Sequence, residues 1–284
     1  MAALDLDSYF ARVGYSGPRA ATLQTLQALH LLHPAAIPFE NLDPLMKQPV
    51  PLELKALATK LVDQGRGGYC YEQNTLFAGV LEALGFSVAT LAARVQWNLP
   101  PGTIGPRHHM VLRIDLPEGR YIADVGFGRL TLTAPLRLVP DIEQSTPHGL
   151  HRLIQVGDEF QLQAKLGQQW APIFQLALQE QTPADWETAN WFTSTNPGSI
   201  FTHSLMVARP VGDSRYGLFN NDLRIHHPDG RVERRTLKTP DELASVLRND
   251  FRIRVPPGSG EVFERLITGI VHGATSGNSR QASP

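Results

Sequence analysis

Residues 66–74 of the chain read RGGYCYEQN, and Cys70 within them is the single cysteine of 284 residues. A solitary thiol cannot form a disulfide within the chain. The preceding Gly67 and Gly68 let the backbone lie close to whatever packs against the sulfur. Cys70 also opens a helical pattern, and the positive end of a helix favours a thiolate over a thiol. We therefore interpret Cys70 as a nucleophile, with a buried structural cysteine as the alternative.

The segment that follows Cys70 predicts an amphipathic helix over residues 70–84. Gly85 stands just past its end, where glycine commonly terminates helices. The apolar residues recur with the 3.6-residue period of a helix and would form its buried face. They are Leu76, Phe77, Val80, Leu81 and Leu84. Burial of this face would fix the N-terminal end of the helix, and the nucleophile with it.

Two further segments predict a pair of antiparallel strands. The sequence alternates over residues 109–114 and 121–125, and the turn signal LPEG separates them at residues 116–119. If Asp115 faces Arg120, the apolar side chains of both strands lie on one side of the pair. This register therefore gives one coherent apolar face.

The same register brings a base close to a carboxylate. A thiolate nucleophile needs a base, and the base needs a group that orients it. On the opposite side of the strand pair, His109 comes within side-chain reach of Asp124. A loop one residue shorter would bring His108 over instead and would scatter the apolar face. We therefore predict His109 as the base and Asp124 as its orienting group.

Four blocks of the chain together resemble the arylamine N-acetyltransferase family. They are residues 37–42 (IPFENL), residues 66–74, His109 with its apolar strand, and residues 124–128 (DVGFG). The likeness extends from the N-terminus to about residue 210 and weakens beyond. The cysteine block is its most specific part.

The resemblance implies a reaction and the residues that carry it. It implies a Cys-His-Asp triad in the order Cys70, His109 and Asp124. It also implies acetyl-coenzyme A as the donor, no metal, and an arylamine, arylhydrazine or hydrazide as the acceptor. The acetyl group would pass through a thioester on Cys70 in a ping-pong cycle.

The fold that the resemblance implies is α+β, with a cysteine-protease-like Cys-His-Asp core. A helical bundle with the nucleophile would cover residues 1–85, a central β-barrel with His109 and Asp124 residues 86–205, and an α/β lid residues 206–284. The periodicity agrees with this order. It predicts helices at 6–14, 19–32, 52–64, 70–84 and 239–250, short strands between 87 and 174, one strand over 218–226, a hairpin turn at 228–230, and a disordered tail at 274–284.

The resemblance also points to positions that would bind the two substrates. An aromatic acceptor needs flat apolar walls, although core packing is the alternative for each position. The candidates are Phe39, Val95, Gly126, Phe127 and Phe201. The Pro/Gly-rich residues 98–107 form a loop suited to lining a cleft, and Thr103 in this loop is the candidate coenzyme contact. The loop lacks the Gly-Lys-Ser/Thr ending of a phosphate-binding loop.

Composition limits the partners and the compartment. A net charge of −1 gives no electrostatic reason to expect nucleic acid or an anionic membrane. The basic residues 231–235 are interrupted by an acid, and a solvated face explains them more simply than a contact with coenzyme phosphates. One cysteine, no signal peptide and no long apolar run predict a reducing cytoplasm. The oligomeric state stays open, a homo-oligomer included.

Three other functions fit parts of the pattern. Metal binding by the pairs 108–109 and 226–227 is disfavoured, because adjacent side chains diverge on a strand and no further ligand set accompanies them. A papain- or transglutaminase-like hydrolase or acyl transferase shares the Cys, His, Asp order but takes its acyl group from a peptide amide. A non-catalytic binding module on the same fold is the third alternative, which the reactivity of Cys70 would test.

Overall fold

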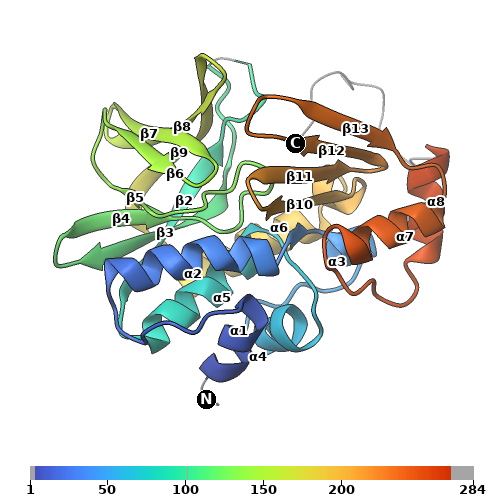
Figure 1. Ribbon diagram of the computed structural model, residues 1–284, viewed down its shortest axis with the longest axis horizontal. Coiled ribbons are helices and arrows are strands. Elements are labelled where there is room, and N and C mark those ends of the chain that lie inside the picture. Colours follow the sequence, from blue (N-terminus) through green and yellow to red (C-terminus); the bar gives the residue numbers. More distant parts are fainter. Residues whose placement is uncertain (1–3, 101, 270–284) are drawn as a thin grey trace.

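The computed structural model describes residues 4–100 and 102–269. The N-terminal helices form a lower layer, an eight-stranded sheet stands on one side above it, and a five-stranded sheet stands on the other (Figure 1). Within the described residues, no helix is long and apolar enough to cross a membrane. The tail predicted to be disordered, residues 274–284, lies outside the described residues.

The N-terminal helices pack around the helix that begins at Cys70. Helix α1 ends as predicted at Gly14, whose φ of 74° is left-handed. The helix predicted at 19–32 has the wrong bounds: it starts after Thr22, whose hydroxyl caps it, and it includes Pro34. A proline in the last turn removes one backbone hydrogen bond and leaves the earlier turns intact. The helices are α1 (Leu6–Val13), α2 (Leu23–Ala36), α3 (Leu42–Leu45), α4 (Leu54–Leu57) and α5 (Cys70–Ala83).

The helix predicted over residues 52–64 changes type part of the way along. It begins as α4 and continues as a π-helix, η1 (Ala58–Asp63). Gly65, with a φ of 62°, follows it. Residues 66–69 then lead directly into α5, so the π-helix lies immediately before the nucleophile block.

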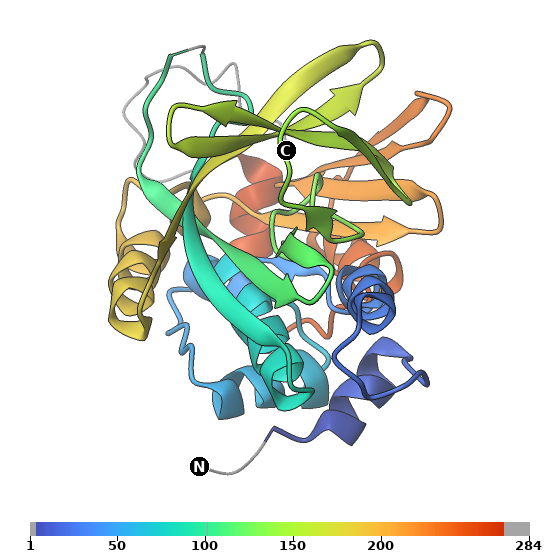
Figure 2. The ribbon, with the colours of Figure 1, turned by 90° about the vertical axis from the view of Figure 1, so that its left-hand side faces the viewer.

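The eight-stranded sheet curls into a nearly closed barrel (Figure 2). Its strand order is β5-β4-β3-β2-β9-β8-β7-β6, and every neighbouring pair is antiparallel. The strands are β2 (Ser87–Val95), β3 (Arg107–Leu116), β4 (Gly119–Ala123), β5 (Leu136–Arg137), β6 (Glu143–Thr146), β7 (Gly149–Val156), β8 (Glu159–Leu166) and β9 (Gln169–Glu180).

The predicted register of β3 and β4 is confirmed. Asp115 faces Arg120, and the strands continue to Leu116 and Gly119. The apolar face of the pair packs against the N-terminal helices. It is formed by Leu112, Ile114, Tyr121 and Ala123. The hairpin therefore joins the barrel to the helical layer.

The second sheet joins residues from both ends of the chain. Its order is β1-β10-β11-β12-β13, and Phe39 of β1 pairs with Ala208 of β10. The single strand predicted at 218–226 is wrong, because a turn at residues 220–221 divides it; Asn220 has a φ of 53°. The elements are β1 (Phe39–Glu40), β10 (Met206–Val211), β11 (Ser214–Phe219), β12 (Asp222–His226) and β13 (Val232–Thr236), with α7 (Pro240–Asn249) and α8 (Gly260–Thr268) beside them. We propose that the chain divides into a helical bundle over residues 1–85, a β-barrel over residues 86–205 and an α/β lid over residues 206–284.

Helix α6 (Pro183–Thr195) connects the two sheets and is followed by the short 3₁₀ helix η2 (Ile200–Thr202). Helix α6 is not among the helices predicted from the sequence, although Thr182 and Asp185 form a helix start: the Thr182 N–H donates to the Asp185 carboxylate at 2.7 Å. Asn190 of this helix accepts a hydrogen bond from the Tyr69 hydroxyl. Helix α6 therefore braces the residue before Cys70.

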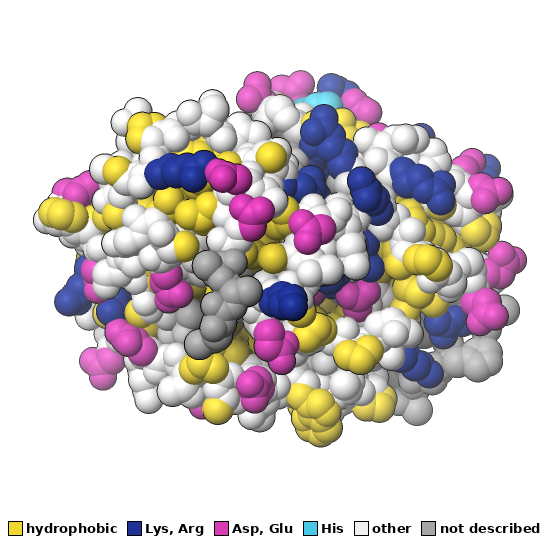
Figure 3. All heavy atoms as spheres, turned by 90° about the horizontal axis from the view of Figure 1, so that it is seen from below, with side chains coloured by type: hydrophobic (Ala, Val, Ile, Leu, Met, Phe, Trp, Pro, Cys, Tyr) yellow, Lys and Arg dark blue, Asp and Glu magenta, His cyan; other side chains and the backbone are white. Residues whose placement is uncertain are grey.

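Acidic and basic side chains are interspersed on the face formed largely by the helical layer (Figure 3). This face therefore carries charges of both signs.

Candidate active site

Cys70 lies where two stretches of backbone meet without room for side chains. A Cβ built on Gly126 would stand 2.8 Å from Cys70 Cα and 3.1 Å from Gln73 Cβ. A Cβ built on Gly67 would stand 2.1 Å from the Pro38 carbonyl oxygen. Glycine is required at both positions because the contacts are to backbone atoms or to a fixed helix. The loop after β4 is therefore seated directly on the N-terminal end of α5.

The Gly126→Ala substitution should separate these two segments. We expect it to destabilise the protein by about 1–3 kcal/mol, the usual cost of overpacking, and to slow catalysis because Asp124 and Cys70 would move apart. Urea unfolding and steady-state kinetics would measure both effects. Gly105→Ala is the matched control, since its nearest neighbour is Val95 O at 3.8 Å. Wild-type stability and rate in the Gly126 variant would contradict the tight contact.

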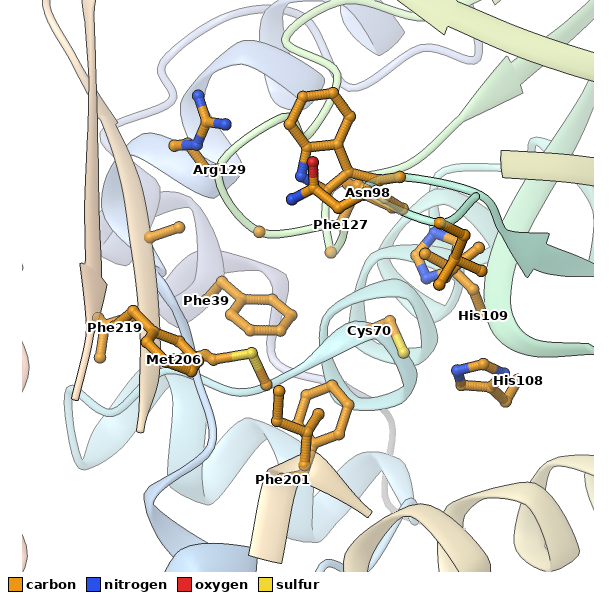
Figure 4. A pocket seen from close by; sticks show the side chains of 18 residues that line it. Phe39, Cys70, Asn98, His108, His109, Phe127, Arg129, Phe201, Met206 and Phe219 are labelled. Atoms are coloured by element: carbon orange, nitrogen blue, oxygen red, sulfur yellow. The ribbon is translucent and has the colours of Figure 1, made fainter. Parts of the chain in front are cut away.

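His109 and Asp124 meet as predicted. The His109 ring donates from Nε2 to Asp124 Oδ2 at 2.7 Å, and both side chains are buried. Because Nε2 is used in this way, Nδ1 is the ring nitrogen left to interact with Cys70, whose sulfur helps to raise the pKa of His109. Figure 4 shows Cys70 and His109 beside the same cavity. The imidazole is therefore bonded to the carboxylate and lines the same cavity as the sulfur.

The carboxylate of Asp124 is held by more than the histidine. Its Oδ1 accepts hydrogen bonds from Asn74 Nδ2 and from the Gly126 N–H, both at 2.9 Å. The Asp124 N–H in turn donates to Nε2 of His30 at 3.1 Å. Asn74 and His30 were not predicted to have a role in the site. Asn74 stands in the RGGYCYEQN block, whereas nothing local in the sequence points to His30.

These contacts set the charges of the pair. Burial lowers the pKa of His109, but the charge of Asp124 and the hydrogen bonds to Asp124 and Cys70 outweigh it and raise the pKa to about 10. Burial raises the pKa of Asp124, but the charge and hydrogen bond of His109, with the bonds from Asn74 and Gly126, bring it below its usual value. Burial lowers the pKa of His30 to about 4, so its Nε2 is free to accept the Asp124 N–H. At neutral pH His109 is therefore an imidazolium beside a carboxylate.

A cavity of about 310 Å³ opens in front of Cys70 and His109 (Figure 4). All of the acceptor positions named from the sequence line it. They are Phe39, Val95, Gly126, Phe127 and Phe201. The aromatic walls are packed against the triad: the Phe127 ring stands edge-on to His109 with centroids 5.1 Å apart. The cavity can hold a flat apolar group against the nucleophile.

The cavity also has wall residues that the sequence does not predict. Met206 and Phe219 come from β10 and β11, and Arg129 follows the DVGFG block directly. Asn98 and Leu99 of the Pro/Gly-rich loop line the cavity, whereas Thr103 of the same loop is not among the lining residues. The structure therefore does not bring the candidate coenzyme contact to this cavity. Within the described part of the chain, no group of three or more His, Cys, Asp or Glu side chains gathers that could hold a metal.

Comparisons with known proteins find close relatives over almost the whole chain. A family model described as N-acetyltransferase matches residues 22–259, well past the point where the sequence resemblance was expected to weaken. An arylamine N-acetyltransferase of Escherichia coli (strain K12) is 42% identical over 251 residues, which cover 88% of this chain and 89% of that protein. The structure of the arylamine N-acetyltransferase of Mycobacterium marinum matches with a TM-score of 0.90 at 40% identity, over 94% of this chain and 100% of that chain. The structure of the Mycobacterium marinum enzyme in complex with CoA matches with a TM-score of 0.86 at 40% identity, over 94% of this chain and 98% of that chain.

Proposed function

The chain belongs to the arylamine N-acetyltransferase family, and we propose that Cys70, His109 and Asp124 transfer an acetyl group from acetyl-coenzyme A to the nitrogen of an arylamine, arylhydrazine or hydrazide. One observation carries the residue assignment. His109, which is hydrogen-bonded to Asp124 at 2.7 Å, lines together with Cys70 a cavity that has aromatic rings in its wall.

The first half of the reaction loads the enzyme. The Cys70 thiolate, balanced by the His109 imidazolium, attacks the carbonyl carbon of the thioester and forms a new C–S bond. The tetrahedral intermediate then expels coenzyme A as a thiolate, which takes the imidazolium proton. Exchange of one thioester for another is close to thermoneutral, so the enzyme supplies mainly position and stabilisation of the oxyanion. Backbone N–H groups at the N-terminal end of α5 are the proposed oxyanion donors.

The second half passes the acetyl group to nitrogen. A neutral amine in the cavity attacks the acetyl carbon, and His109 accepts a proton from the nitrogen as the C–S bond to Cys70 breaks. Weakly basic arylamines are neutral and nucleophilic at pH 7, whereas alkylamines are mostly protonated. Phe127, packed edge-on to His109, and Phe201 offer apolar surfaces for the ring of such an amine. Asp124 stabilises the imidazolium in both halves.

The two alternative functions are not favoured. A papain- or transglutaminase-like enzyme would share the Cys-His-Asp order, and a binding module would share the fold. Family membership over residues 22–259 favours a thioester donor instead.

We further propose small-molecule partners and a cytoplasmic location. The net charge of −1 supports small-molecule partners rather than nucleic acid or a membrane surface. The single cysteine supports a cytoplasmic location.

Intact-mass measurement tests the proposed acetyl-enzyme directly. The purified protein, mixed with acetyl-coenzyme A without an amine, should gain the mass of one acetyl group, and peptide mapping should place it on Cys70. Addition of an arylamine should remove the adduct and yield the N-acetyl product. A protein that releases coenzyme A with an amine but never carries the adduct would contradict the ping-pong cycle.

A further inference from the structure

A network of buried charges lies beneath the residues that lead into the nucleophile helix. Arg66 contacts the carboxylates of Glu40 and Asp43, each at 2.8 Å. Lys60 contacts Asp43 at 2.5 Å and Glu72 at 2.6 Å. These side chains are mostly or fully buried, so the ion pairs are little screened by water. The triad chemistry uses none of them.

Glu72 connects this network to the nucleophile. It lies two residues after Cys70, and its side chain folds back under the start of α5. One carboxylate oxygen accepts a hydrogen bond from the Tyr69 N–H at 3.1 Å, and the other accepts one from Lys60 Nζ at 2.6 Å. The fit is close, since a Cβ on Gly68 would lie 2.8 Å from the Glu72 side chain. Glu72 therefore fixes the backbone on both sides of Cys70.

Lys60 reaches Glu72 from the π-helix η1. π-helical turns are rare in proteins and are found frequently at functional sites. A π turn takes more residues than an α turn, so side chains after residue 58 point in directions that a continued α-helix would not give them. Leu61 packs into the core and anchors this segment. The unusual helix thus delivers one ammonium group to a carboxylate that is only 1% exposed.

We propose that Lys60 is a positioning residue for the nucleophile: it holds Glu72 as a carboxylate, and this carboxylate fixes the first turn of α5 so that Cys70 faces His109. The role deepens the proposed acetyl transfer and rests on it. Lys60 touches neither the cavity nor the triad, so its effect must pass through Glu72 and Tyr69.

The charges around Glu72 make this device sensitive to pH. Burial raises the pKa of Glu72 to about 7; Lys60 from η1 opposes the rise, while Asp43 from α3 and Glu40 from β1 add to it. Arg66, which lies shortly before Cys70, forms ion pairs with Glu40 and Asp43. Lys60 stays charged, because burial is outweighed by Glu72, Glu40 and Asp43, which raise its pKa. Glu72 therefore titrates near neutrality.

The active form is the carboxylate, so activity should be present above the pKa of Glu72 and lost as the pH falls through it. The triad pair does not titrate there: the pKa of His109 is raised to about 10, and that of Asp124 lies below its usual value. In a plot of the acetylation rate against pH, a fall on the acid side of about pH 7 (the acid limb) would thus report protonation of Glu72. Measuring that step alone avoids the ionisation of the amine.

The experiment is a pH profile of the rate of acetyl-enzyme formation, followed by quenched intact-mass measurement. The variants are Lys60→Met, Lys60→Arg, Glu72→Gln, the double variant with Lys60→Met and Glu72→Gln, and Lys55→Met as control. Lys55 is exposed on the preceding turn. We expect Lys60→Met to lower the rate at pH 7 by up to about 100-fold, which a misplacement of about 1 Å can cause. Its acid limb should move up by roughly one pH unit, because the buried carboxylate loses its cation. Lys60→Arg should recover most of the rate.

The glutamine variants make the test specific. Glu72→Gln keeps an oxygen for the Tyr69 N–H and carries no titrating group, so its profile should lack the limb near pH 7. The double variant should be faster than Lys60→Met alone, since a neutral amide needs no cation. A fold defect would instead lower the rate equally at every pH. An unchanged limb in Lys60→Met and Glu72→Gln, or a double variant no faster than Lys60→Met, would overturn the positioning role. A wild-type enzyme that forms no adduct would overturn the proposed function itself.

Discussion

Replacing Cys70 by alanine should abolish acetyl transfer. The sulfur is the proposed atom that forms a bond to the acetyl carbon, and without it no acetyl-enzyme can form. We expect kcat/KM to fall by about 10⁴-fold or more, as when a triad nucleophile is removed elsewhere. Release of coenzyme A, measured in the presence and absence of an arylamine, would detect the loss. Cys70 lies at the cavity wall, so the smaller side chain should leave the fold intact.

The serine variant sharpens this prediction. Cys70→Ser keeps nearly the same shape, but a hydroxyl ionises far less readily than a thiol and cannot form a stable ion pair with His109. Both variants should retain the wild-type melting temperature and should still bind coenzyme A. An alanine variant that transfers acetyl groups at the wild-type rate would mean direct transfer from donor to amine, and the role of Cys70 would be wrong.

Local periodicity was enough to predict the centre of the site. The apolar repeat after Cys70 placed α5, and the alternation around residues 116–119 placed the β3–β4 hairpin with the correct register. Register decides which side chain faces which, because a shift of one residue moves every side chain to the other face. The contact of His109 with Asp124 followed from that register.

The rest of the site depends on contacts between residues far apart in the chain. Phe39 pairs with Ala208, so the cavity wall needs a sheet built from both ends of the chain. The turn at residues 220–221 lacks glycine and proline, and the strand pattern continues through it. Met206 and Phe219 were therefore missed as cavity residues, and His30 reaches Asp124 across 94 residues of sequence. No pattern within a short window carries this information.

The buried charge network shows the same limit. The sequence places Arg66 in a motif and Lys60 in the helix predicted over residues 52–64. Their contacts with Glu40, Asp43 and Glu72 depend on how α3, η1 and α5 pack together. Sequence periodicity predicts the helices over residues 52–64 and 70–84, but it predicts neither α3 nor which charges meet inside.

The Asp124→Asn substitution should remove one charge from the triad while it keeps most of the structure. The asparagine oxygen can still accept hydrogen bonds from Asn74 and from the Gly126 N–H, which now bind Asp124 Oδ1. Its amide nitrogen would replace Oδ2, which now lies 2.7 Å from His109 Nε2. This nitrogen donates, so Nε2 must accept, and the remaining ring proton moves to Nδ1, which faces the sulfur. The imidazole then cannot accept a proton from Cys70 or from the amine, and we expect kcat/KM to fall by about 10³- to 10⁴-fold.

The pH dependence of stability provides an independent readout of the same charge. The pKa of His109 is raised from its usual 6.5 to about 10, chiefly by Asp124 against the effect of burial. The stabilisation by the imidazolium is therefore fully present below pH 6.5 and is lost as the pH rises through about 10. The free energy of unfolding, measured with urea between pH 6.5 and about 10, should fall less with rising pH in Asp124→Asn than in the wild type. Asp115→Asn is the matched control, because Asp115 is a partly exposed carboxylate at the other end of β3, paired with Arg113. Suppose that the Asp124 variant kept the wild-type rate and also the wild-type dependence of its unfolding free energy on pH. The charge of the carboxylate would then not be what holds His109 as an imidazolium.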